Sequence, residues 1–107
     1  MYAPFEEAAE FPGMTSYLDM METYNPDGKI AGLGLQATSA FLMFATAANA
    51  CLDSNNNVLE RECVLAAGKT ITSWTGGGLH SETNPAENRP PKCGAILGVK
   101  GGKWTRI

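Results

Sequence analysis

LQATSAFLMFATAANACL, residues 35–52, is the stretch that decides the fold. Its spacing predicts a helix that is rich in alanine and apolar on most faces, and such a helix is covered on more than one side. The polar residues that interrupt the wider apolar run 31–52 are Gln36, Thr38, Ser39, Thr46 and Asn49. Because of these interruptions we expect no run long enough to cross a bilayer. The stretch is interpreted as a buried helix.

A second helix is predicted before this one, between the break at Pro12-Gly13 and the turn Asn25–Gly28. Thr15 or Ser16 is the expected cap, because a hydroxyl there can accept a hydrogen bond from a free N–H of the first turn. The residues that share one face at helical spacing are Met14, Tyr17, Leu18, Met21 and Tyr24.

The sequence after residue 52 predicts a polar loop, a third helix and a C-terminal β-hairpin. The third helix is expected at Val58–Ala67, with Gly68 as its stop. Residues 76–91 are poor in apolar side chains and predict a loop. The segment CGAILGV, the two-glycine turn 100–103 and the segment WTRI then predict a C-terminal β-hairpin.

Composition limits the class of protein. The chain has 107 residues, 44% hydrophobic and 18% charged, which is typical of one small folded domain. Its formal net charge is −3 and its eight Lys and Arg are scattered, whereas a nucleic-acid-binding surface shows a clustered basic stripe. We therefore expect no nucleic-acid partner. No basic or apolar leader follows Met1, so no export signal is predicted within this chain.

The three cysteines are Cys51, Cys63 and Cys93, and an odd number leaves at least one unpaired within the chain. Cys51 and Cys63 flank the turn LDSNNN at the facing ends of two predicted helices. This placement favours a disulfide between them where geometry permits, with two buried thiols as the alternative. No CxxC and no zinc-type His/Cys spacing occurs, so no metal and no other cofactor is predicted.

SWTGGGLHSETNP, residues 73–85, holds three consecutive glycines and the single histidine. It is not a phosphate-binding loop, because no GK[ST] follows the glycines. His80 and Cys93 are candidates for a base and a nucleophile, but no Asp or Asn is placed to support them, and a turn histidine is favoured. GLGLQA, residues 32–37, matches GxGxxA without a preceding strand, so close packing is favoured over a nucleotide site. No catalytic set is assembled, so no enzyme activity is predicted.

Three stretches resemble one known family. They are residues 12–51, residues 59–85 and residues 92–107 (KCGAILGVKGGKWTRI). Together they resemble the C-terminal part of the type 1 periplasmic binding proteins, and more narrowly the branched-chain amino acid substrate-binding proteins of ABC transporters. The three-cysteine pattern and the segment WTGGGLH are similar to the actinobacterial branch. The residues 73–85 then correspond to the family's loop before its terminal hairpin, where glycines allow positive φ values.

The resemblance implies an α/β fold in which residues 1–107 form a single segment, the C-terminal part of a two-lobe protein. It implies about three helices plus a C-terminal β-hairpin, with residues 1–11 as a hinge crossover. Hinge closure around a ligand in the cleft is the family's mechanism. The family's upstream residues that bind an amino acid's carboxylate and amine have no matching position here. Tyr2, Phe5 and Glu6 are the ligand-binding candidates near the cleft, with a structural hinge role as the alternative for each.

The function implied is solute capture for an ABC importer. The ligand would be an amino acid or a similar small polar molecule, and the partner a membrane permease. The parent protein would be extracytoplasmic, in the cell envelope or as a secreted lipoprotein. Its N-terminal lobe would be encoded upstream of this chain. The isolated chain would then expose a large apolar patch or form a homo-oligomer.

Two interpretations from other classes stay open. In the first, the chain is a stand-alone helical interaction module that self-associates through the helix 35–52. In the second, it is a small cysteine-dependent enzyme that uses Cys93 and His80.

Overall fold

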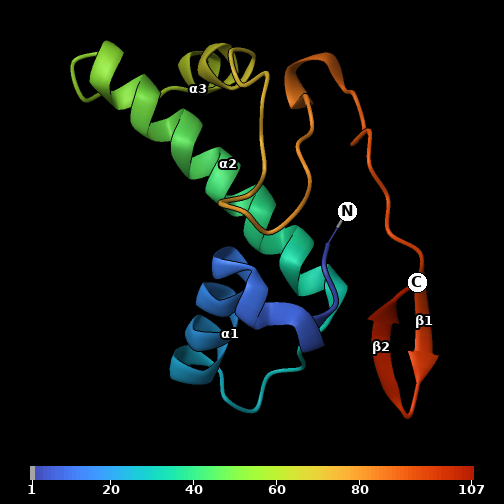
Figure 1. The fold of residues 1–107 in the computed structure, drawn as a ribbon. Coiled ribbons are helices and arrows are strands. Elements are labelled where there is room, and N and C mark those ends of the chain that lie inside the picture. The colour runs from blue at the N-terminus through green and yellow to red at the C-terminus, as the bar shows by residue number, and fades with distance from the viewer. Residues whose placement is uncertain (1) are drawn as a thin grey trace.

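The computed structural model describes residues 2–107 and contains both helices and strands. The elements in chain order are the 3₁₀-helix η1 (Phe5–Glu10), α1 (Pro12–Tyr24), α2 (Gly32–Ser54), α3 (Arg61–Gly68), the 3₁₀-helix η2 (Pro85–Glu87), β1 (Leu97–Lys100) and β2 (Lys103–Arg106) (Figure 1). The expected order of three α-helices and a C-terminal hairpin is therefore confirmed.

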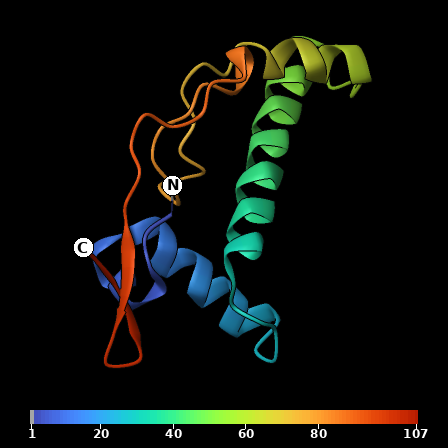
Figure 2. The same ribbon diagram turned by 90° about the vertical axis from the view of Figure 1, so that its right-hand side faces the viewer.

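Helix α2 is the longest helix of the described residues, and the other elements are arranged along it. Its 23 residues extend over roughly 34 Å at the rise of an α-helix. Helix α1 and η1 lie at its N-terminal end, and α3 folds back at its far end (Figures 1 and 2). It begins three residues before the expected start: Ala31 is extended, with a φ of −154°, and its carbonyl oxygen accepts a hydrogen bond from the N–H of Gly34 at 3.0 Å. It ends near Asn56 and Asn57, whose positive φ angles of 52° and 61° turn the chain away.

The largest buried cluster sits where α1 crosses the beginning of α2. We call residues 73–85, which contain the three consecutive glycines, the glycine loop. Met14 and Tyr17 of α1 contact Leu35 of α2 and Leu79 of this loop. Tyr24, at the end of the expected face, is exposed. One expectation for α1 is wrong. Neither Thr15 nor Ser16 caps the helix: Pro12 occupies the first turn, as its fixed φ and missing N–H allow.

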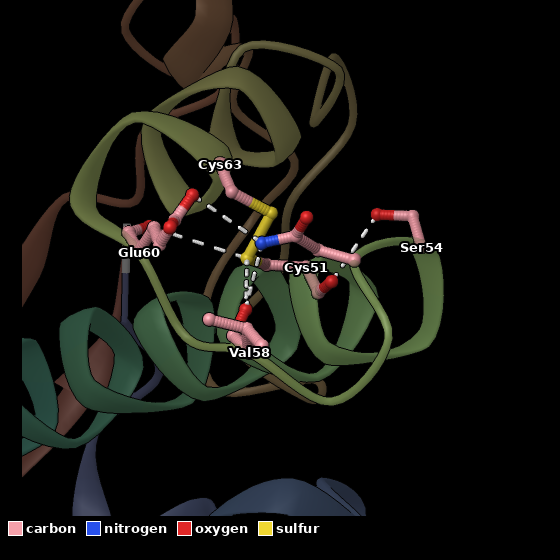
Figure 3. The surroundings of a disulfide bond; sticks show 6 residues. Cys51, Ser54, Val58, Glu60 and Cys63 are labelled. Carbon is pink, nitrogen blue, oxygen red and sulfur yellow. Dashed lines mark hydrogen bonds between the residues drawn. A yellow bond between two sulfur atoms is a disulfide. The ribbon is translucent and has the colours of Figure 1, made fainter.

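Helix α3 is tied to the end of α2 by a disulfide between Cys51 and Cys63, which confirms the expected pairing (Figure 3). The two Cα atoms are 5.4 Å apart, within the range that disulfides need. The helix begins at Arg61 rather than Val58, because the amide of Asn55 donates to the carbonyl oxygen of Val58 at 2.9 Å and holds that residue in the loop. No residue of α3 is fully buried.

The C-terminal hairpin pairs β1 with β2 in antiparallel register, with Val99 opposite Trp104 and Lys100 opposite Lys103. Gly101 and Gly102 form its turn with φ angles of 59° and 77°. Two consecutive positive φ angles are what a two-residue turn of type I′ requires, so the expected turn is confirmed. Within residues 2–107 this hairpin is the whole sheet.

The molecule is more extended than its length predicts. Its radius of gyration is 16.0 Å and its principal extents are 54 × 33 × 19 Å, whereas a compact chain of this length has a radius of gyration of about 13 Å. Its accessible surface is 7556 Å², against about 5,800 Å² for a folded monomer of this mass. About 1,800 Å² of surface is therefore left uncovered relative to a self-contained domain.

Helix α2 has the length and composition of a membrane-spanning helix, contrary to the expectation from the run 31–52. An 18-residue window within its 23 residues has a mean hydropathy of 1.3, and 28% of that window is buried. The expectation was wrong because the interrupting residues are uncharged and lower the mean only modestly. Core helices of soluble proteins satisfy the same criterion but are mostly buried, so the expectation that this helix is covered on more than one side is also wrong for this chain.

Candidate functional site

A cavity at the start of α2 brings together two of the three predicted ligand-binding residues, Tyr2 and Phe5. It measures about 250 Å³. The residues that line it are Tyr2, Ala3, Pro4, Phe5, Gly32, Leu35, Leu97 and Trp104. Four parts of the chain meet here: the N-terminal segment, η1, the first turns of α2 and the hairpin. We call this the α2-start cavity.

Aromatic and aliphatic side chains form most of the α2-start cavity, and Tyr2 supplies its phenol. Partial burial raises the pKa of Tyr2 above its ordinary value, because the charged phenolate loses hydration there. A phenol is already neutral at physiological pH at its ordinary pKa of 10.0, so Tyr2 can donate a hydrogen bond there.

The third predicted residue, Glu6, is outside the residues that line this cavity. Its Oε1 accepts a hydrogen bond from the backbone N–H of Trp104 at 3.1 Å. Glu6 thus ties η1 to strand β2, which is a structural contact. Arg106 reinforces the same junction through an ion pair with Glu7 at 2.6 Å.

Gly32, in the first turn of α2, also lines the cavity. The residue before the helix, Ala31, makes no side-chain cap, so the N–H groups of Gly32 and Leu33 lack intrahelical partners. A Cβ placed on Gly32 would meet no atom within 4 Å, so the backbone is uncovered on this side. A helix N-terminus attracts negative charge.

A hydrogen-bonded cluster lies beside the cavity and joins the glycine loop to α2. The indole Nε1–H of Trp74 donates to Ser39 Oγ at 3.0 Å, and Ser39 Oγ lies 2.7 Å from Nε2 of His80. Nδ1 of His80 lies 2.8 Å from the carbonyl oxygen of Ser81. The His80 ring also meets the ring of Tyr2 edge to face, with centroids 5.3 Å apart. We call Ser39, Trp74 and His80 the Ser39 cluster.

The partners fix the proton positions in this cluster. A carbonyl oxygen can only accept, so Nδ1 of His80 carries a proton, and in the neutral ring Nε2 then accepts from the hydroxyl of Ser39. Ser39 is 5% exposed, and a Cβ on Gly76 would lie 2.5 Å from its Oγ. No substrate atom can approach Ser39 Oγ without moving the glycine loop. The contacts therefore serve to hold that loop against α2.

Cys93 and His80, the candidates for a nucleophile and base, line a second cavity of about 320 Å³ together with Arg106. Cys93 is a free, exposed thiol. Both ring nitrogens of His80 are engaged by Ser39 and Ser81, so a proton transfer from the thiol would first require one of these bonds to break.

Comparisons of the chain with protein-family models, with curated proteins and with solved structures found no match. The resemblance to the periplasmic binding proteins therefore stays a prediction.

Two of the three ligand-binding candidates, Tyr2 and Phe5, line the α2-start cavity, whereas the Ser39 cluster was not predicted from the sequence. One signal was available: Leu35 and Ser39 are four residues apart and so share a helical face, and Leu35 was expected to be buried. A polar residue on a buried face requires partners. What the sequence does not reveal is that these partners come from the loop some 40 positions later.

Proposed function

We propose that this chain is the C-terminal part of an extracytoplasmic solute-binding protein that captures an amino acid or a similar small ligand for an ABC importer. The observation that carries the proposal is the uncovered surface of about 1,800 Å² relative to a compact monomer. A stable interface covers about 800 Å² on each partner. The chain thus leaves more surface open than one ordinary protein partner would cover, as expected for part of a larger two-lobe fold.

The α2-start cavity supports the same proposal. Its volume of about 250 Å³ falls below the usual range for a ligand pocket of roughly 300 Å³ upward. A second lobe facing Tyr2 and Phe5 would enlarge and close it, and would supply the carboxylate- and amine-binding groups that the family places upstream. In this proposal Tyr2 and Phe5 form one wall of the ligand site.

The disulfide between Cys51 and Cys63 is weakly compatible with an extracytoplasmic location, because disulfides persist in oxidising compartments. The alternative of a lipid environment for α2 is disfavoured by its neighbours. Insertion into a bilayer would place the charged side chains of Arg61 and Glu62, next to the disulfide, at or near lipid. It would also remove the polar loop that satisfies Ser39.

One observation favours the second candidate, a self-associating helical module. Leu33, Phe41 and Phe44 are large apolar residues of α2 that are exposed, with Phe41 67% exposed. Phe41 and Phe44 contact each other across 6.4 Å between ring centroids, so they form a continuous apolar surface. A partner helix packed along this face would bury both rings.

The decisive experiment begins with the coding sequence upstream of Met1. The proposal expects an in-frame α/β lobe with a signal peptide, and the joined protein should bind branched-chain amino acids in a calorimetric titration. Tyr2→Ala in that protein should weaken binding at least tenfold. Tyr24→Ala, which alters an exposed residue at the far end of α1, is the matched control and should leave affinity unchanged.

Absence of an upstream lobe would contradict the proposal and favour the module. The module predicts that residues 1–107 alone form a stable homo-oligomer by light scattering. Phe41→Asp with Phe44→Asp should dissociate it. Asn49→Asp, which also adds a negative charge at an exposed position of the same helix, should not.

A further inference from the structure

The hairpin has one strand edge that is closed and one that is open. Ile107 N–H donates to the carbonyl oxygen of Ile96 at 3.0 Å, which marks that pair as hydrogen-bonded. Because bonded and non-bonded pairs alternate in an antiparallel ladder, Gly98 also faces its partner strand. Leu97 and Val99 therefore direct their N–H and C=O groups away from β2, along the outer edge of β1.

The opposite edge, along β2, is occupied. The same alternation directs the N–H of Trp104 outward, and that N–H donates to Glu6 Oε1 at 3.1 Å. The outward-lying Arg106 is held by Glu7 at 2.6 Å. Helix η1 thus covers the β2 side, while β1 lies outermost in the molecule (Figure 1). Among the described residues, no backbone partner is found for the N–H groups of Leu97 and Val99.

We propose that the open edge of β1 pairs with the same edge of a second copy of this chain, forming a four-stranded antiparallel sheet in the order β2-β1-β1-β2. Unpaired strand edges add further strands readily, and an isolated two-stranded hairpin is marginal in water. This inference does not depend on the proposed function.

The residues of β1 suit self-pairing about a twofold axis at Gly98. Leu97 of one copy then faces Val99 of the other in both directions, and these are the residues whose backbone groups point outward. The two pairs exchange four hydrogen bonds. Lys100 faces Ile96 of the second copy, so no two lysines lie opposite each other, as like charges there would oppose pairing.

The closed edge explains why a dimer is the expected assembly. Each copy offers one open edge, so pairing uses the same surface on both partners and stops at two chains. A hairpin with two open edges would instead continue into a filament. The uncovered surface of about 1,800 Å² exceeds the roughly 800 Å² that each partner of a stable complex buries, so the chain has surface available for this contact.

Cross-linking of residues 1–107 in a Cys93→Ser background tests the geometry. Gly98→Cys places two thiols opposite each other on the axis, where paired Cα atoms lie about 4.5 Å apart, within disulfide reach. The new Cβ would contact the tip of the Ile107 side chain at 2.8 Å, and that terminal side chain is exposed and free to move. Thr105→Cys is the matched control: Thr105 pairs with Gly98 in the hairpin, but its two copies would be roughly 14 Å apart, three strand spacings.

The expected result is that mild oxidation cross-links at least ten times more of the Gly98→Cys chains than of the Thr105→Cys chains. Val99→Pro removes an outward N–H without removing a hydrogen bond of the hairpin, so it should weaken the dimer at least tenfold in light scattering and retain the far-UV circular dichroism spectrum of the folded chain. Equal cross-linking of the two cysteine variants would overturn the inference. A dimer that is unaffected by Val99→Pro, or a wild-type chain that is monomeric at millimolar concentration, would also overturn it.

Discussion

The disulfide between Cys51 and Cys63 makes a quantitative prediction about one end of the molecule. It closes a loop with a sequence separation of 12, and loop-closure entropy gives a stabilisation of about 3 kcal/mol for a loop of this size. Helix α3 has eight residues and none is fully buried, and an isolated helix this short is unstable in water. We therefore expect the bond, rather than packing, to keep α3 folded against α2.

Replacement of both cysteines, Cys51→Ala with Cys63→Ala, is expected to open α3 locally. A loss of about 3 kcal/mol corresponds to roughly a 100-fold increase in amide exchange rate. Hydrogen–deuterium exchange followed by mass spectrometry would measure it peptide by peptide. The amides of α3 should lose this protection, whereas those of α1, whose buried residues belong to the other cluster, should change less than threefold.

Cys93→Ser is the control, because Cys93 is exposed and unpaired. Exchange in this variant should match the wild-type chain. The reasoning is refuted if α3 keeps its protection without the disulfide, since packing would then hold it. It is also refuted if α1 and α3 lose protection equally, because the two ends would then unfold as one unit.

Three further predictions concern the Ser39 cluster and the α2-start cavity. Ser39→Ala leaves the indole N–H of its neighbour without an acceptor and should lower the free energy of unfolding by about 1–3 kcal/mol in urea. Gly76→Ala should lower the free energy of unfolding in urea more than Gly77→Ala does. Both positions have a positive φ, but a Cβ on Gly76 would lie 2.5 Å from the Ser39 Oγ, whereas a Cβ on Gly77 would lie about 4.0 Å from its nearest atom. The pKa of Tyr2 is raised above 10.0, so the folded chain keeps this proton to a higher pH than the unfolded chain does. The free energy of unfolding should therefore fall as the pH rises through and beyond 10.0, and Tyr2→Phe should make this fall smaller.

The order of the elements was predictable because each carries a local signal. The alanine-rich run predicts α2, the two glycines at 101 and 102 require a turn with positive φ, and the polar turn between Cys51 and Cys63 places two sulfurs at facing helix ends. Each of these signals lies within 18 residues of sequence or fewer. The boundaries of α3 were not predictable in the same way, because a side-chain bond from Asn55 to the Val58 carbonyl delays its start.

The Ser39 cluster was not predictable because its members are far apart in the sequence. Ser39 Oγ is joined to groups 35 and 41 positions later, and periodicity within α2 carries no information about that loop. Tyr2 and Phe5, the ligand-binding candidates from the family resemblance, line the α2-start cavity, and their binding role stays a prediction. Trp104 and Leu97 reach the same cavity through the path of the hairpin. Contacts that depend on the path of the chain through space cannot be found from local sequence patterns.

Helix α2 is the single element that belongs to both ends of this molecule. The cluster around Leu35 and the disulfide at Cys51 are separated by 16 residues, or roughly 24 Å along the helix axis. At such a distance, substitutions act independently on stability. A fluorophore or an affinity tag can therefore be attached near α3 without altering the α2-start cavity. Because the helix between the two ends is rigid, a rotation of one end would displace the other end. Distances between probes placed at the two ends of α2 would therefore detect such a rotation in solution.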